Sequence, residues 1–149
     1  MARRLALALA TALLLRTPGE AAHAQGTPVP IVEVQGVPVY VAQYGFTYNS
    51  SLTTTSTLQD GDPGEVWMFE GLADECSEII MRSTEFDSYL VLRQNVPFGE
   101  IVSEDDDSGD GADALIRVRL PATDTYFITA TLATPDPMLG HYTLDLSRC

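Results

Sequence analysis

The segment from Phe86 to Leu120 most constrains the fold, because two alternating apolar runs flank a block of acids and glycines. The first run reads FDSYLVL and the last reads ALIRVRL, with EDDDSGDGAD immediately before the last. Carboxylates are not buried without partners, so the block is either a solvated turn or a cation site. The alternation on both sides predicts a strand before the block and a strand after it.

Short runs with the same two-residue period recur along the chain after residue 50, separated by turns rich in Gly, Pro and Asp. One run places Trp67 and Phe69 on one face, and a Thr-rich run at Ser51–Leu58 is a further candidate strand. No segment after residue 24 keeps a helical period over about ten residues. About seven to nine short strands predict an all-β, antiparallel sandwich.

Residues 1–24 have the pattern of a secretory signal peptide. Arg3 and Arg4 give a positive start, Leu5–Leu15 is apolar, and Ala22 and Ala24 are small residues at a cleavage site before Gln25. The apolar run is shorter than the roughly 20 residues that span a bilayer. We expect a periplasmic or secreted product, with no membrane insertion after cleavage.

The chain is strongly acidic, with a formal net charge of −13. Removal of residues 1–24 takes away three of the eight basic and one of the 21 acidic residues, which leaves a net charge of −15. Such a chain is repelled by nucleic acids and anionic membranes, and it attracts divalent cations or basic partners. The alternative is that most of these charges serve solubility outside the cell.

Cys76 and Cys149 are the only cysteines, and both lie in the part that is exported. Thiols in such compartments become oxidised, which predicts an intramolecular disulfide. Closure of a loop of this length stabilises a fold by about 4 kcal/mol in the loop-entropy description. A free nucleophilic cysteine and an intermolecular bridge are the alternatives.

Residues 25–50 form an extended segment ahead of the predicted sandwich at residues 51–149. Three prolines and alternating valines predict either a linker or an edge strand, because Pro cannot serve a central strand. Four aromatic residues in this segment are not required by any predicted core strand: Tyr40, Tyr44, Phe46 and Tyr48. They form either an extra strand over a sheet edge or a surface that binds a partner.

An ordered set of short motifs extends over residues 51–146. The motifs are Trp67-x-Phe69, Ile79-x-Met81, Phe86-Asp87-x-Tyr89-Leu90-x-Leu92, Asp105-Asp106, Asp113-Ala114, Leu120-Pro121-Ala122-x-x-x-Tyr126-x-Ile128 and Gly140-x-Tyr142-x-Leu144. In order and spacing they resemble the bacterial pre-peptidase C-terminal domain family. The resemblance implies a jelly-roll-like β-sandwich that is not catalytic, that accompanies secreted peptidases, and that binds calcium in some members.

The acidic loop is the candidate metal site. Calcium takes six to eight oxygen ligands from carboxylates and carbonyls, often in flexible loops that contain glycine. The candidate calcium ligands are Asp87, Asp105, Asp106, Asp107, Asp110 and Asp113. The spacing differs from the EF-hand pattern. The alternative is a solvated turn in which Asp side chains cap backbone N–H groups.

Residue content argues against catalysis. His141 is the only histidine after residue 24, and no G-x-S-x-G motif is present. We therefore expect a monomeric, non-catalytic module that binds an extracellular protein or polysaccharide, or that assists a secreted enzyme. The alternative is a structural domain that calcium stabilises and that has no ligand of its own.

Overall fold

The computed structural model describes residues 24–26, 31–56, 58, 61–134 and 138–149. Within these residues the chain forms eleven strands and no helix, and nine of the strands have five or more residues. No helix of the described part has the length and hydropathy needed to cross a bilayer. The predicted signal peptide lies outside the described residues, apart from Ala24, which begins the first strand.

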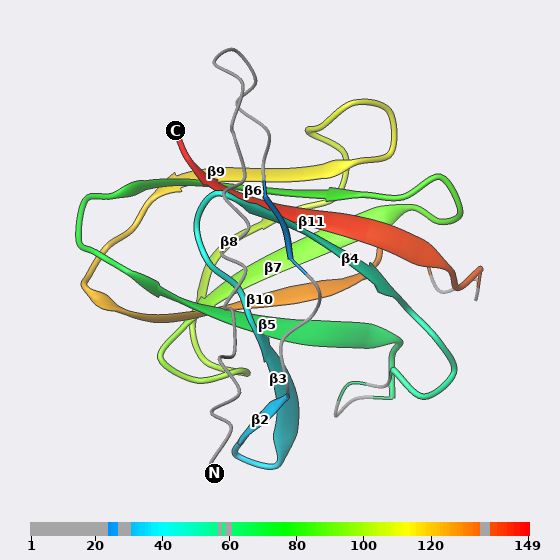
Figure 1. The fold of residues 1–149 in the computed structure, drawn as a ribbon, viewed down its shortest axis with the longest axis horizontal. Coiled ribbons are helices and arrows are strands. Elements are labelled where there is room, and N and C mark those ends of the chain that lie inside the picture. The colour runs from blue at the N-terminus through cyan, green and yellow to red at the C-terminus, as the bar shows by residue number, and fades with distance from the viewer. Residues whose placement is uncertain (1–23, 27–30, 57, 59–60, 135–137) are drawn as a thin grey trace, which may run out of the picture.

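The strands form two sheets that lie one over the other (Figure 1). The first sheet has the order β1-β4-β11-β6-β9, with β1 at Ala24–Gly26, β4 at Phe46–Ser51, β11 at His141–Arg148, β6 at Cys76–Arg82 and β9 at Ala114–Arg119. The second has the order β2-β3-β5-β10-β7-β8, with β2 at Val32–Val34, β3 at Val37–Val41, β5 at Gly64–Gly71, β10 at Asp124–Leu132, β7 at Ser88–Gln94 and β8 at Ile101–Asp105. Neighbours are antiparallel except β1–β4 and β3–β5. The predicted all-β sandwich is confirmed.

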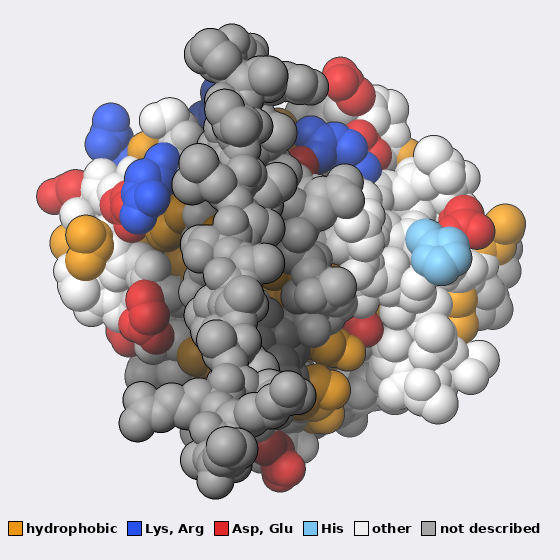
Figure 2. Space-filling model, in the orientation of Figure 1, with side chains coloured by type: hydrophobic (Ala, Val, Ile, Leu, Met, Phe, Trp, Pro, Cys, Tyr) orange, Lys and Arg blue, Asp and Glu red, His pale blue; other side chains and the backbone are white. Residues whose placement is uncertain are grey.

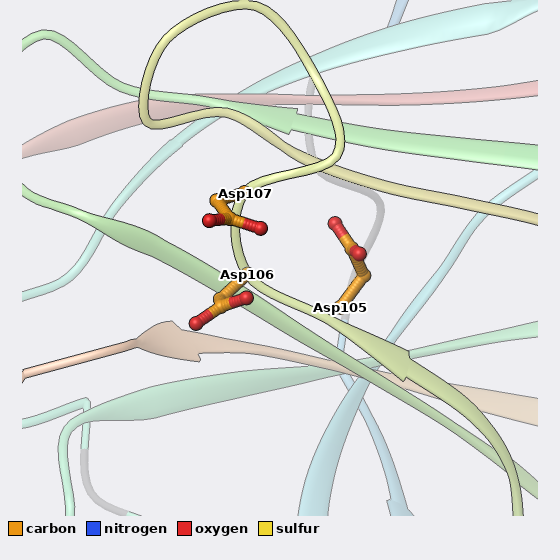
Figure 3. Close-up of side chains that lie close together, drawn as sticks. All are labelled: Asp105, Asp106 and Asp107. Atoms are coloured by element: carbon orange, nitrogen blue, oxygen red, sulfur yellow. The ribbon is translucent and has the colours of Figure 1, made fainter.

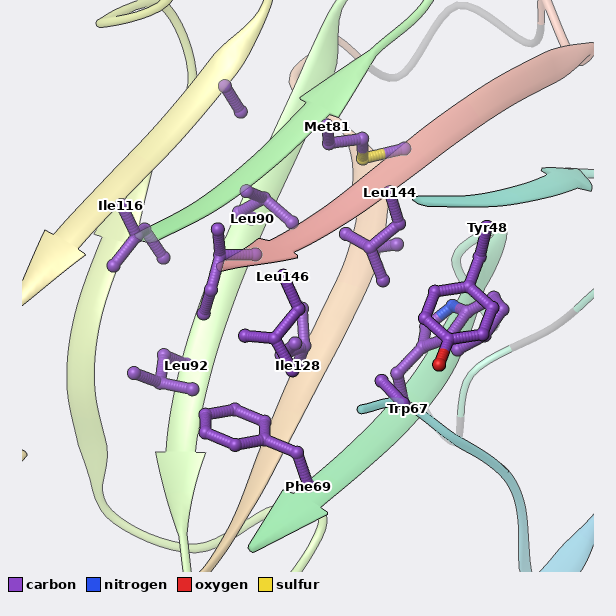
Figure 4. Packing of buried hydrophobic residues seen from close by; sticks show 14 of the residues in the cluster. Tyr48, Trp67, Phe69, Met81, Leu90, Leu92, Ile116, Ile128, Leu144 and Leu146 are labelled. Carbon is purple, nitrogen blue, oxygen red and sulfur yellow. The ribbon is translucent and has the colours of Figure 1, made fainter. Parts of the chain in front are cut away.

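The core lies between the sheets and is filled by the apolar members of the alternating runs (Figure 4). Trp67 and Phe69 point inward from β5, as their spacing predicts, and are 0% and 2% exposed. Leu144 and Leu146 reach them from β11 in the opposite sheet. Burial of such side chains is the main stabilising contribution to a sandwich, at about 1.5–3 kcal/mol each.

The segment at residues 25–50 belongs to both sheets. Its β3 pairs with β5 in one sheet, and its β4 pairs with β11 in the other. Val39 and Tyr48 are buried in the interior. The predicted boundary at residue 50 is therefore not a boundary of the fold, since β4 runs across it.

The prediction of a strand at Ser51–Leu58 is wrong for residues 52–56, and residue 57 lies outside the described residues. β4 ends at Ser51, and residues 52–56 form a loop. The N–H of Thr53 donates to Ser56 Oγ (3.1 Å), and the N–H of Thr55 donates to Thr53 Oγ1 (3.3 Å). The hydroxyl side chains accept hydrogen bonds from these backbone N–H groups within the loop. A high content of β-branched residues was therefore not sufficient for pairing with a neighbouring strand.

The predicted disulfide between Cys76 and Cys149 is confirmed, with a Cα–Cα distance of 5.3 Å. The N–H of Cys149 also donates to the carbonyl of Cys76 (3.1 Å). The bond joins the end of β11 to the start of its neighbour β6, so it fixes the central strand of the first sheet.

Candidate functional site

The acidic loop connects β8 to β9 and brings three carboxylates together (Figure 3). Ligand oxygens of Asp105, Asp106 and Asp107 lie within 4.8 Å of one another. Asp105 Oδ2 accepts hydrogen bonds from the N–H groups of Ser108 and Leu115, both at 2.9 Å. The Ser108 hydroxyl donates to the other oxygen. Asp105 thus caps backbone N–H groups of the turn. This arrangement is the one expected for a solvated turn, the alternative to a cation site.

The surroundings of Asp105 favour its charged form. Burial alone raises the pKa of this carboxyl, but the hydrogen bonds from Leu115 and Ser108 outweigh burial and lower the pKa below its usual value. Hydrogen bonds to a carboxylate stabilise the ionised form, because each donor dipole points at the negative charge.

The other predicted calcium ligands have separate roles. Asp113 forms an ion pair with Arg82 at 3.8 Å between Oδ2 and Nε. Asp110 supplies its backbone carbonyl to the N–H of Asp113 at 3.3 Å, and Asp87 supplies its carbonyl to Ala133 at 2.9 Å. Three of the six predicted ligands therefore form the carboxylate cluster of the described chain, and calcium there stays a prediction.

The aromatic residues of the segment at 25–50 pack against the core. Tyr48 is 2% exposed, so its predicted place on a binding surface is wrong: the inward row of β4 carries it into the interior. Tyr44 contacts Phe69 edge to face, and Phe46 lies beside Tyr48. Tyr40 is partly buried and stacks on Trp67, with 4.8 Å between the ring centroids.

Tyr44 is also covered by a cation. The guanidinium carbon of Arg148 lies 4.1 Å from the centre of the Tyr44 ring. Arg148 forms an ion pair with Glu75, and the Tyr44 hydroxyl lies 2.5 Å from Ser77 Oγ. These contacts close one side of the core beside the disulfide, so Tyr44 has a structural role.

Glu65 is the functional candidate that the sequence did not reveal. It is half-buried on the inward row of β5, at a junction of the two sheets. Its Oε2 accepts hydrogen bonds from Ser50 Oγ (2.7 Å) on β4 and from Tyr142 Oη (2.5 Å) on β11. The indole N–H of Trp67 in turn donates to Tyr142 Oη (2.9 Å). Four side chains thus form one hydrogen-bonded network across the sandwich.

This network keeps the Tyr142 hydroxyl in its neutral form. Burial raises the pKa of Tyr142 well above its usual value, and the negative charge of Glu65 together with its hydrogen bond raises it further. The hydroxyl consequently remains a donor to Glu65 at ordinary pH.

A hollow of about 260 Å³ opens beside the network. Tyr40 and Glu65 line it together with Ile31, Pro38 and Ser56. The pKa of Tyr40 is raised, first by burial and then by the charge of Glu65 and a hydrogen bond with it. An aromatic ring and a carboxylate therefore share one opening with an apolar rim.

A second hollow of about 430 Å³ lies over the outer face of the first sheet, with Arg82, Asp113 and His141 in its lining. His141 is exposed at the start of β11. Its Nδ1 lies 2.6 Å from Ser51 Oγ, and its backbone N–H donates to Glu85. Glu85 thus binds the backbone of His141, and the Ser–His contact is an exposed surface pair without the third group of a catalytic triad among its described contacts.

No protein-family model matches the chain. No curated protein matches it in sequence. Among the solved structures that are similar to this chain, two share 12% sequence identity with it. The first is the pre-peptidase C-terminal domain of collagenase from Bacillus anthracis, with a TM-score of 0.59 over 74% of this chain and 96% of that chain. The second is Aeromonas hydrophila PliG, a periplasmic lysozyme inhibitor of g-type lysozyme, with a TM-score of 0.56 over 85% of this chain and 100% of that one.

Structural similarity at 12% sequence identity is evidence about the fold alone. The resemblance read from the ordered motifs is confirmed in that respect, because the two-sheet architecture matches the collagenase domain over nearly its whole length. The chain therefore has a β-sandwich fold of the pre-peptidase C-terminal type.

Proposed function

We propose that the chain is an exported, non-catalytic module that binds a basic protein. The observation that supports this proposal is the negative charge of the chain, which its own arginines do not balance. In the described part, arginines form ion pairs with four acidic residues, namely Glu75, Glu78, Asp113 and Asp145. With 21 acidic and eight basic residues in the chain, most carboxylates have no arginine to neutralise them. Figure 2 shows acidic side chains at several separate places on one face.

The negative electrostatic field of such a chain favours association with a positively charged partner, because it steers the partner during diffusion. The fold and the disulfide support the same proposal. PliG, which has a similar fold, is a periplasmic inhibitor of g-type lysozyme. The Cys76–Cys149 bond is typical of an oxidising compartment outside the cytoplasm.

The aromatic side chains favour a protein partner over a polysaccharide. Carbohydrate platforms expose flat rings, whereas Trp67, Tyr48 and Tyr142 are buried here and Tyr40, Tyr44 and Phe46 are half-buried against the core. A protein interface does not need exposed rings, since charge complementarity and apolar contacts suffice.

The proposal is tested with the disulfide-bonded chain and a defined set of basic secreted proteins that includes a g-type lysozyme. Biolayer interferometry measures each Kd at 50 and 300 mM NaCl. We expect micromolar or tighter binding to at least one member, weakened about tenfold at the higher salt because the charges are screened. An acidic protein of similar size is the control. Absence of binding to every basic protein, or binding that salt does not weaken, contradicts the proposal.

A further inference from the structure

The hollow beside Tyr40 contains a carboxylate, that of Glu65, which no arginine of the described residues neutralises. In the described part of the chain, no arginine lies within ion-pair distance of Glu65. Its donors are neutral hydroxyl groups, those of Ser50 and Tyr142 and, beside them, that of Tyr40. Withdrawing a charge from water is costly unless a partner of opposite sign is supplied. A partner from outside the chain would remove that cost.

We propose that this hollow receives one arginine side chain of the basic protein partner, an inference that rests on the proposed function. Glu65 binds the guanidinium group, and the Tyr40 ring packs against its plane. Arginine suits the site better than lysine because its planar group both pairs with carboxylates and stacks on aromatic rings.

The geometry of Glu65 leaves room for a further donor. The hydroxyls of Ser50 and Tyr142 both reach the same oxygen, Oε2. A carboxylate has about four acceptor positions on its two oxygens, so with three hydroxyl donors, those of Ser50, Tyr142 and Tyr40, it retains capacity for one more. Because the two bonds hold the side chain from β4 and β11, the carboxylate is oriented before a ligand arrives, which lowers the entropic cost of binding.

The lining of the hollow matches the rest of an arginine side chain. Ile31, which is 53% exposed, and Pro38 supply apolar surface at the rim for the methylene stem. Ser56 adds a hydroxyl to the lining. One face of the Tyr40 ring is already fixed by stacking on Trp67, so the ring does not need to be ordered when the ligand binds.

Trp67 reports on this site directly, because it is the only tryptophan of the chain and contacts both Tyr40 and Tyr142. The experiment titrates the ¹⁵N-labelled protein with N-acetyl-arginine amide and follows the indole N–H resonance. N-acetyl-citrulline amide, which has nearly the same shape without the charge, is the matched ligand control. We expect a saturable shift with a millimolar Kd for the arginine compound, and a Kd at least fivefold weaker for citrulline.

Variants then locate the binding site. Glu65→Gln is expected to weaken binding of the arginine compound at least fivefold, whereas Glu70→Gln, at an exposed position of the same strand, leaves it unchanged. Tyr40→Leu removes the ring but keeps the carboxylate, and it is expected to weaken binding about threefold. Circular dichroism melting establishes that each variant is folded. No saturable shift up to 50 mM, an equal response to citrulline, or an unchanged Kd in folded Glu65→Gln overturns the inference.

Binding of the basic protein separates this inference from the proposed function. If the wild type and Glu65→Gln bind the partner with the same Kd, the arginine site is wrong while the binding function stands. If no basic protein binds but the arginine compound still shifts Trp67 through Glu65, the proposed function fails and the site for a guanidinium group stands.

Discussion

Replacing Tyr142 by Phe removes one hydroxyl from the middle of the network that joins the two sheets. The ring stays in the core, where Tyr142 is 2% exposed, so no large cavity forms. Two hydrogen bonds are lost: the one accepted from the Trp67 indole at 2.9 Å and the one donated to Glu65 at 2.5 Å. The substitution therefore measures the hydrogen bonds with little change in packing.

The magnitude follows from what each partner loses. Trp67 is 0% exposed, so its N–H is left without an acceptor, at a cost of about 2 kcal/mol. Glu65 keeps the Ser50 hydroxyl and is half-buried, so the second loss is smaller, at about 1 kcal/mol. We expect the free energy of unfolding to fall by about 3 kcal/mol. For a domain of this size that lowers Tm by about 9 °C.

Urea unfolding followed by circular dichroism and by Trp67 fluorescence measures this change, with the same m-value expected for both proteins. Tyr89→Phe is the control, since its hydroxyl donates to Glu104 (2.7 Å) in an exposed contact and its loss costs under about 1 kcal/mol. A loss below about 1 kcal/mol in Tyr142→Phe, or one equal to that of the control, refutes the reasoning.

The pH dependence gives a second measurement on the same variant. Because the folded-state pKa of Tyr142 is raised, its contribution to stability is complete below the unfolded value of about 10 and is lost as pH rises above it. The wild type is therefore expected to lose more stability than Tyr142→Phe between pH 9 and pH 11. Parallel pH profiles of the two proteins would contradict this assignment.

Three further predictions concern the disulfide and the acidic loop. Cys76→Ala with Cys149→Ala lowers the free energy of unfolding by about 4 kcal/mol in urea titrations, for a sequence separation of 73, and a loss below about 1 kcal/mol opposes this. Asp105→Asn lowers the free energy of unfolding at pH 7. Because the pKa of Asp105 is lowered in the folded state, the difference in this free energy between wild type and variant shrinks as pH falls below about 4. A difference that stays constant down to pH 2 contradicts this. Millimolar calcium raises Tm in the wild type but not in Asp106→Asn with Asp107→Asn, and an unchanged wild-type Tm removes the calcium prediction.

The sequence predicted which residues are buried in the core better than it predicted which distant segments lie side by side. Alternation placed Trp67 and Phe69 on one face of a strand, and both are buried in the structure. It worked because a sandwich strand has one face against the other sheet, which forces a two-residue period. The disulfide was predictable for a different reason, since the two cysteines follow a predicted signal peptide and have one intramolecular pairing available.

Contacts between distant segments were not predictable in the same way. Glu65 follows a turn rich in Gly and Asp, so the sequence suggests a solvated acid, yet its partners Ser50 and Tyr142 lie 15 and 77 residues away. The sequence left open whether Tyr48 lies in an extra strand or on a surface, because nothing in it indicates that β4 lies beside β11. In both cases strand order decides the environment, and strand order is not encoded in local periodicity.

The order of the first sheet has a consequence for how the chain matures. β11 follows every other described strand in the sequence, yet it lies between β4 and β6, which do not border each other. When the chain is synthesised from its N-terminus, the facing edges of β4 and β6 have no partner until β11 has been made. Their unpaired edges stay open to wrong partners throughout that interval. Closure of the first sheet is therefore a late event that waits for β11, the last of the described strands to be made.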